Sequence, residues 1–233
     1  MSTHIDAPKS AVASAVLLPG DPRRAKWIAG HFLEGSVRYN QARNMDGYTG
    51  WVPNGKLVSV QGTGIGMSSL NVYVTELIKD FGVKRLIRVG TAGALQKDMK
   101  LGDIVLAQGG CSNSGANLRR FDGMQFAPLP DFDLLCGARE AATRLEIPVR
   151  VGNVLSTEYF YNPKPEEWKR WAAYGVLAVE MENAELCTLA AENNVQALTI
   201  LTISDVLPTG EEMSADDREN TLTNMVRIAL EII

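Results

Sequence analysis

The 233-residue sequence has few cysteines, and their arrangement excludes several kinds of protein. Cys111, Cys136 and Cys187 are odd in number and lie far apart in the sequence. They do not show the short paired spacing of a zinc site or the dense cysteine pattern of a small secreted domain. We therefore expect reduced thiols in a cytoplasmic protein, and no metal site.

The sequence also lacks an excess of positive charge and any long hydrophobic run. Its net charge of −4 and pI of about 5.3 argue against a nucleic-acid surface, which has a basic footprint. No apolar run approaches the roughly 20 residues that a membrane helix needs. Residues 1–20 contain no basic segment followed by a long apolar one, so we expect no signal peptide and no membrane association.

The sequence does contain short apolar runs that alternate with amphipathic segments. Hydrophobic residues make up 45% of the chain, which is enough for one substantial core, and no linker interrupts it. We expect a single α/β domain over residues 1–233, a three-layer α/β/α arrangement with a mixed central β-sheet. The expected strands are 15–18, 36–39, 48–52, 57–60, 84–89, 104–107, 149–155, 177–179 and 198–203. One expected helix begins at residue 23, and the others span 67–81, 131–145, 165–173, 182–193 and 214–233.

The segment Leu18–Ala25 is the most informative part of the sequence. An apolar strand ends at Pro19-Gly20, and a helix opens near Arg24. Glycine lets backbone N–H groups approach an oxyanion, and the helix N-terminus favours negative charge. Arginine adds a planar fork that matches phosphate. A simple turn with a capped helix would have the same pattern, so both interpretations stay open here.

Other polar residues lie in or just after predicted strands, where α/β proteins bind ligands. Arg88 lies inside an apolar run, so it must either pair with a core carboxylate or serve an anion. Asp205 ends a strand and could act as an acid, although Asp at a strand end is often a turn residue. Arg218 could pair with Asp205 or be solvated. The remaining polar residues of this kind are Thr91, Glu180, Glu182 and Ser204, and Met181 lies between the two glutamates.

The glycine-rich segment 62–66 lacks the spacing of a dinucleotide fingerprint. We interpret it as a turn that lets the helix at 67–81 approach a ligand. Further motifs are Arg43–Gly50, Arg88–Ala94, Phe160–Pro163 and Val179–Glu182. With the segment at 18–26, the Ser204-Asp205 pair and the terminal His4, they resemble the hexameric, bacterial-type purine nucleoside phosphorylases of the nucleoside phosphorylase superfamily. The likeness covers essentially the whole chain.

The resemblance implies phosphorolysis of purine ribonucleosides or deoxyribonucleosides, with phosphate as co-substrate and no cofactor. It implies that Gly20, Arg24, Arg88 and Thr91 bind phosphate, with Arg43 supplied by a neighbouring subunit of a homohexamer built from dimers. The implied catalytic pair is Asp205, the general acid to the purine, and Arg218. The implied nucleoside-binding residues are His4 of the neighbour, Phe160, Val179, Glu180, Met181, Glu182 and Ser204.

The sequence departs from the family pattern at several positions. Thr91 replaces a common serine, Ile65 a usual methionine, and the loop 206–210 lacks the usual histidine, while Asn183 stands where a small residue is common. These changes bear on the preferred base and sugar. Uridine phosphorylase is the nearest rival, but its Gln-x-Arg element is absent from residues 155–175. A nucleosidase that uses water, or a nucleoside-binding protein without turnover, are further alternatives.

Overall fold

The computed structural model describes residues 2–214 and 222–233, and the account below concerns these residues. Its strands are β1 (Ala15–Leu18), β2 (Glu34–Asn40), β3 (Gly47–Trp51), β4 (Leu57–Gln61), β5 (Arg85–Ala94), β6 (Ile104–Ser112), β7 (Val149–Ser156), β8 (Ala178–Glu180), β9 (Gln196–Val206) and β10 (Glu211–Glu212). Its helices are α1 (Pro22–Phe32), α2 (Met67–Lys79), α3 (Ala116–Arg120), α4 (Phe132–Arg144), α5 (Glu167–Ala173), α6 (Asn183–Asn193) and α8 (Thr223–Glu231), with 3₁₀ turns η1 (Lys9–Ala11) and η2 (Ala42–Asn44).

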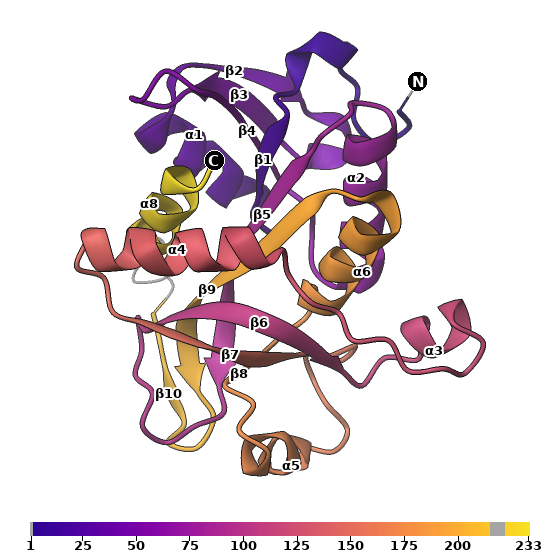
Figure 1. Ribbon diagram of the computed structural model, residues 1–233, viewed down its shortest axis with the longest axis vertical. Helices are drawn as coiled ribbons and strands as arrows, with labels where there is room; N and C mark the ends of the chain where they lie inside the picture. The colour runs from indigo at the N-terminus through magenta and orange to yellow at the C-terminus, as the bar shows by residue number, and fades with distance from the viewer. Residues whose placement is uncertain (1, 215–221) are drawn as a thin grey trace.

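Helices cover both faces of one mixed sheet, as the sequence predicts (Figure 1). Helices α1, α4 and α8 bury their apolar sides on one face, around core residues such as Ile28, Leu134 and Val226. Helices α2 and α6 lie side by side on the other face, where Leu77 and Leu186 belong to a second core. The apolar positions of these helices recur at helical spacing, and their burial stabilises the three layers.

The sheet branches at β5, and one branch closes on itself. The first half of β5 pairs in parallel with β1, while its last two residues pair with β8 on the same edge. The opposite edge of β5 pairs with β9 along its whole length. Since β9 also pairs with β6, β6 with β7, and β7 with β8, five strands form a closed ring around a third core.

The structure corrects several predicted boundaries. Strand β5 continues through the glycine-rich segment 90–94, because β8 and β9 bind its two edges there. Strand β9 continues to Val206, so Ser204 and Asp205 lie within the strand and not after it. The final helix, predicted over 214–233, is described only from Thr223, and Ser214 is not helical. Helix α3 and strand β10 were not predicted.

Among the described residues, no helix is both long enough and apolar enough to cross a membrane.

Candidate active site

A pocket of about 740 Å³ opens where the two branches of the sheet separate. Between the β1 pairing and the β8 pairing, residues 89–92 of β5 have one sheet neighbour, β9, in the described pairings. This gap exposes the side of β5 to the pocket. The pocket is lined by most of the residues that the sequence singles out: Gly20, Arg24, Arg88, Thr91, Phe160, Val179, Glu180, Met181, Glu182, Ser204 and Asp205.

Strand register explains why Gly20 and Arg88 meet. Leu18, the last residue of β1, pairs with Arg88, so the turn after β1 runs directly past the arginine. Gly20 packs against the turn at Gly64: its carbonyl accepts a hydrogen bond of 2.9 Å from the Gly64 N–H. A Cβ at Gly20 would lie 3.0 Å from the Gly64 oxygen, so a side chain there would push the two turns apart.

Helix α1 begins at this same point, and its N-terminus borders the pocket. Asp21 is the N-cap, and its side chain accepts a 2.8 Å hydrogen bond from the Arg23 N–H. Arg24 stands in the first turn of the helix and lines the pocket, while Arg23 is exposed and does not line it. The helix dipole and Arg24 both favour an anion at this end of the pocket.

Arg88 is a paired core charge, as one of the two interpretations has it, and it also lines the pocket. Its side chain is buried; Nη2 binds Glu182 and Nε lies 3.4 Å from Glu180. The third nitrogen, Nη1, is buried and has no hydrogen-bond partner among the described residues. It lies 4.0 Å from where a Cβ of Gly20 would be. A buried unpaired donor is costly, and an anion between Gly20 and Arg88 would satisfy it.

Glu180 is held by the protein itself. Ser156 Oγ donates to it at 2.5 Å, and the backbone N–H groups of Glu182 and Asn183 donate at 2.8 and 2.9 Å. Burial, reinforced by the charge of Glu182, raises the pKa of Glu180 to about 7, although Arg88 and the hydrogen bonds oppose the shift. Through these contacts Glu180 holds Arg88 and the first residues of α6 in position.

Glu182 is also tied to the protein. It accepts a 2.5 Å hydrogen bond from the Gly66 N–H in addition to its pair with Arg88. Glu182 therefore links the glycine-rich turn before α2 to the arginine. Gly64 and Ile65 of this turn line the pocket, whereas no residue of α2 does, so the approach of the helix at 67–81 to a ligand stays a prediction.

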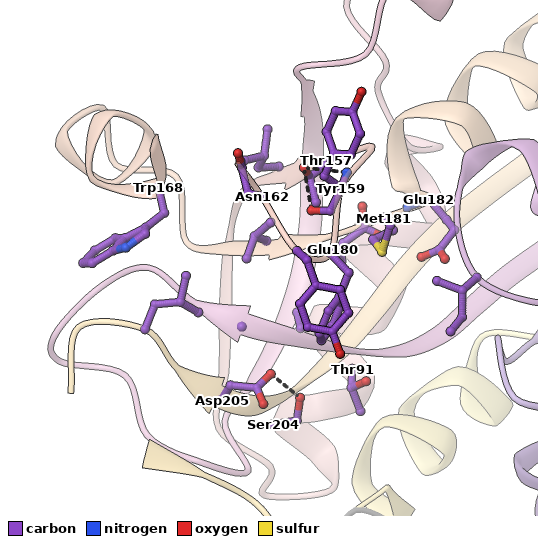
Figure 2. Close-up of a pocket in the computed structure, with 18 of the residues that line it drawn as sticks. Thr91, Thr157, Tyr159, Asn162, Trp168, Glu180, Met181, Glu182, Ser204 and Asp205 are labelled. Carbon is purple, nitrogen blue, oxygen red and sulfur yellow. Dashed lines mark hydrogen bonds between the residues drawn. The ribbon is translucent and has the colours of Figure 1, made fainter. Parts of the chain in front are cut away.

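At the other end of the pocket, Gly93 lies beside the carboxylate of Asp205, which Figure 2 shows next to Ser204. Gly93 pairs with Val179 on one side and Asp205 on the other. Ala92 pairs with Ile203, so Ser204 is an extra residue in β9. Such a bulge re-aims the next side chain and is common beside active sites. Ser204 Oγ donates a 2.9 Å hydrogen bond to Asp205 Oδ2.

Sequence reasoning missed several residues at this end. A Cβ at Gly93 would lie 2.5 Å from Leu207 Cδ1 and 3.8 Å from Asp205 Oδ2, which makes Gly93 a close-contact position. Trp168 packs near Leu155 and also lines the pocket (Figure 2). The signal for Gly93 is its pairing with Val179 and Asp205, two residues that the sequence does single out, and that pairing is not visible in the sequence.

His4 and Arg43 do not line this pocket. They meet instead in a second cavity of about 470 Å³, together with Met45, Ser69 and Tyr73. The ring of His4 is held within its own chain, because Nδ1 lies 2.6 Å from Glu76 Oε1. The two residues that the resemblance places in a neighbouring subunit's site thus line the same cavity, and it is not the first pocket.

Arg218 lies outside the described residues. Among the described residues, no group of three His, Cys, Asp or Glu side chains is arranged to hold a metal ion.

The chain belongs to the Phosphorylase superfamily, whose sequence profile matches residues 14–233. Among curated relatives, a DeoD-type purine nucleoside phosphorylase from Thermoanaerobacter sp. (strain X514) is 56% identical over 232 residues, covering 100% of this chain and 99% of the relative. The protein of the same name from Clostridium novyi (strain NT) is 53% identical, with the same coverage. That from Bacillus cytotoxicus is 51% identical over 231 residues, covering 99% of this chain and 98% of the relative.

Proposed function

We propose that this protein catalyses the phosphorolysis of purine nucleosides, which yields a free purine and ribose 1-phosphate or its 2-deoxy counterpart. The observation that carries the proposal is one pocket with two arginines beside a glycine turn at one end and the side chain of Asp205 at the other. Gly20, Arg24 and Arg88 form the anion end, and Asp205 forms the acid end. Full-length relatives named purine nucleoside phosphorylase support the same activity.

Phosphate is bound at the anion end by the backbone at Gly20, the guanidinium groups of Arg24 and Arg88, and the hydroxyl of Thr91. Arg88 Nη1 supplies a donor that the described protein residues leave unpaired. Fixing phosphate beside the sugar turns a bimolecular attack into a nearly unimolecular step.

The ribose lies between phosphate and base, near Met181 and Glu182. Glu182 accepts hydrogen bonds from the sugar hydroxyls while Arg88 keeps its carboxylate in place. Phe160 and Val179 pack on the purine, and Ser204 lies beside it. Glu180 acts in this site through its contacts with Arg88 and with the backbone at residues 182–183.

During the reaction the bond between sugar C1′ and purine N9 breaks, and a phosphate oxygen forms the new bond to C1′. Positive charge develops on the sugar, and the phosphate stabilises it. Negative charge develops on the purine, and Asp205 neutralises it by giving a proton to N7. Arg218 assists Asp205 in this proposal. The step needs no metal and no organic cofactor.

The working unit of the proposal is a homohexamer built from dimers, in the cytoplasm. His4 and Arg43 line a second cavity together and do not line the pocket of their own chain, which fits a role in an adjacent subunit. There His4 contacts the 5′-hydroxyl of the nucleoside and Arg43 contacts phosphate. The three cysteines are unpaired, which fits a reducing compartment.

The decisive experiment measures release of base from inosine, adenosine, their 2′-deoxy counterparts and uridine, with and without phosphate. Purine release that requires phosphate and forms ribose 1-phosphate is the expected result. Equal rates without phosphate would indicate a nucleosidase, and a preference for uridine would indicate a pyrimidine enzyme. Tight binding of nucleoside without turnover would indicate a binding protein.

Adjacent arginines provide a matched pair for the phosphate site. Arg24→Ala removes a charge-assisted contact and should raise the KM for phosphate about 10- to 100-fold. Arg23→Ala removes the same charge one position earlier, on the exposed side, and should leave that KM nearly unchanged. If the two substitutions had equal effects, Arg24 would act only through its positive charge and not through a direct contact with phosphate.

A further inference from the structure

The N-terminal segment, residues 2–5, is hydrogen-bonded to helix α2 through one carboxylate, that of Glu76. The segment runs beside α2 (Figure 1). Glu76 Oε1 lies 2.6 Å from His4 Nδ1, and Glu76 Oε2 accepts a 2.9 Å hydrogen bond from the His4 backbone N–H. Ser2 Oγ donates to Oε2 as well, and it accepts from the Ile5 N–H at 3.2 Å. Three donors from residues 2–4 thus meet a single carboxylate.

This arrangement decides which nitrogen of the His4 ring carries a proton. An ionised carboxylate can only accept hydrogen bonds, so Nδ1 must be the protonated nitrogen whenever the ring is neutral. Burial alone raises the pKa of Glu76, but the hydrogen bonds from Ser2 and His4 outweigh it and hold that pKa below its usual range. Glu76 is therefore ionised near neutral pH, and it fixes the tautomer of His4.

The same contacts fix the direction of the ring. With Nδ1 bound to Glu76, the remaining ring nitrogen, Nε2, is the one available in the cavity that His4 shares with Arg43. Tyr73 lies edge-on to the imidazole with ring centroids 6.2 Å apart, so the ring is bounded on that side too. In the neutral ring Nε2 is a hydrogen-bond acceptor, and it suits a hydroxyl donor.

We propose that Glu76 is a positioning residue for His4, which it holds with Nε2 presented as an acceptor to the 5′-hydroxyl of a nucleoside bound in the adjacent subunit. This inference rests on the proposed function. It adds that selection for a 5′-hydroxyl depends on a residue that lines neither cavity. Ser2 contributes by tying the first residues of the chain to the same carboxylate.

The test compares inosine with 5′-deoxyinosine, which lacks only the hydroxyl that His4 would contact. In Glu76→Ala the kcat/KM for inosine should fall about 5- to 10-fold, the worth of one neutral hydrogen bond, while that for 5′-deoxyinosine stays within about twofold. Glu76→Gln keeps an oxygen that can accept from Nδ1 and should restore most of the loss. In a His4→Ala background, Glu76→Ala should have no further effect on the ratio of the two substrates.

A matched control is Glu185→Ala on the neighbouring helix α6. Glu185 is a buried carboxylate held by side chains, with Asn71 at 2.7 Å and Arg120 at 2.7 Å, and like Glu76 it lines neither cavity. Its loss should change the activity toward both substrates by the same factor. A purely structural role of Glu76 would give this same equal change, and that result would overturn the proposal.

A second readout does not depend on activity. The sequence has two histidines, so selective ¹⁵N labelling and a His31→Gln variant assign the ring signals of His4. The expected wild-type spectrum shows the Nδ1–H tautomer at a pH where the ring is neutral, and Glu76→Ala should shift it toward Nε2–H. A wild-type Nε2–H tautomer would refute the positioning role even if phosphorolysis is intact. Absence of phosphorolysis in the wild type would instead refute the proposed function.

Discussion

At the scale of single residues, the site depends on charges that are buried and shared. Arg88 contacts two carboxylates, while its Nη1 is buried and has no hydrogen-bond partner among the described residues. Removing it would leave Glu180 and Glu182 as buried like charges, so its loss would damage folding together with phosphate binding. Substitutions at less coupled positions separate these effects better.

Asp205→Asn tests proton transfer with little change of shape. Asparagine can still donate a hydrogen bond, but it cannot deliver a proton to the purine. Release of purine from inosine and adenosine should slow by about 10²- to 10⁴-fold, the usual range for loss of a general acid. A 7-methylated purine nucleoside, whose base leaves without protonation, should be affected much less.

The two classes of substrate provide the internal control for this variant. A binding defect would slow both of them alike. Near wild-type rates with inosine and adenosine would show that another group donates the proton.

Glu180 should make folding stability depend on pH. Because its pKa is raised from 4.5 to about 7, the folded protein holds a proton between these pH values that the unfolded chain releases. Stability should therefore fall as pH rises through this window, by up to about 3 kcal/mol from this group. Denaturant titrations at several pH values should show a flatter dependence in Glu180→Gln. If folding stability depended on pH in Glu180→Gln as steeply as in the wild type, other titratable groups would cause that dependence.

At the scale of elements, the shape of the Asp205 end of the pocket is set by where β5, β8 and β9 meet. Gly93→Ala places a methyl group against Leu207 and near Asp205, while the backbone angles at this residue tolerate alanine. A displacement of about 1 Å at a reacting group can cost about 10²-fold in rate, so kcat/KM for purine nucleosides should fall by that order.

A glycine in α4 serves as the control for Gly93→Ala. A Cβ at Gly137 would meet Ile232 at 3.5 Å, an ordinary contact. Gly137→Ala should leave activity unchanged and stabilise the protein by about 0.5–1 kcal/mol, because alanine is the better helix former. Unchanged activity in Gly93→Ala would mean that the Leu207 side chain moves away from the new methyl group without displacing Asp205.

Local patterns in the sequence predicted most elements, because buried apolar runs and capped amphipathic segments are local features. Strand β1, the turn at Gly20 and helix α1 follow from fewer than twenty consecutive residues. The extent of β5 and the bulge at Ser204 could not be predicted in this way, since they depend on pairing between distant strands. The role of Gly93 was missed for the same reason, and that of Trp168 because a tryptophan in a packed cluster gives no local sign that it also borders a cavity.

At the scale of the whole molecule, the two cavities predict that subunits complete one another's sites. An Arg43→Ala variant and an Asp205→Ala variant should each be nearly inactive. When they are dissociated, mixed and reassembled, a fraction of sites should combine an intact Asp205 with an intact Arg43 from the neighbour. Activity should then return in part, measured as phosphorolysis of inosine in hexamers that mass spectrometry shows to be mixed.

The control reassembles each variant with itself, and activity should not return. Absence of recovery in verified mixed hexamers would show that each chain completes its own pocket.

The closed ring of strands also has a consequence for how the chain folds during synthesis. Arg85 at the start of β5 pairs with Gln196 at the start of β9, which lies 111 residues further along the chain. At about 5–20 residues per second, the ribosome needs about 6–20 s to make that stretch. For that time the apolar edge of β5 has β1 but not β9 beside it, and an unpaired apolar strand is prone to aggregate. The nascent chain is thus most exposed to aggregation before β9 emerges, and this interval is when a chaperone would matter most.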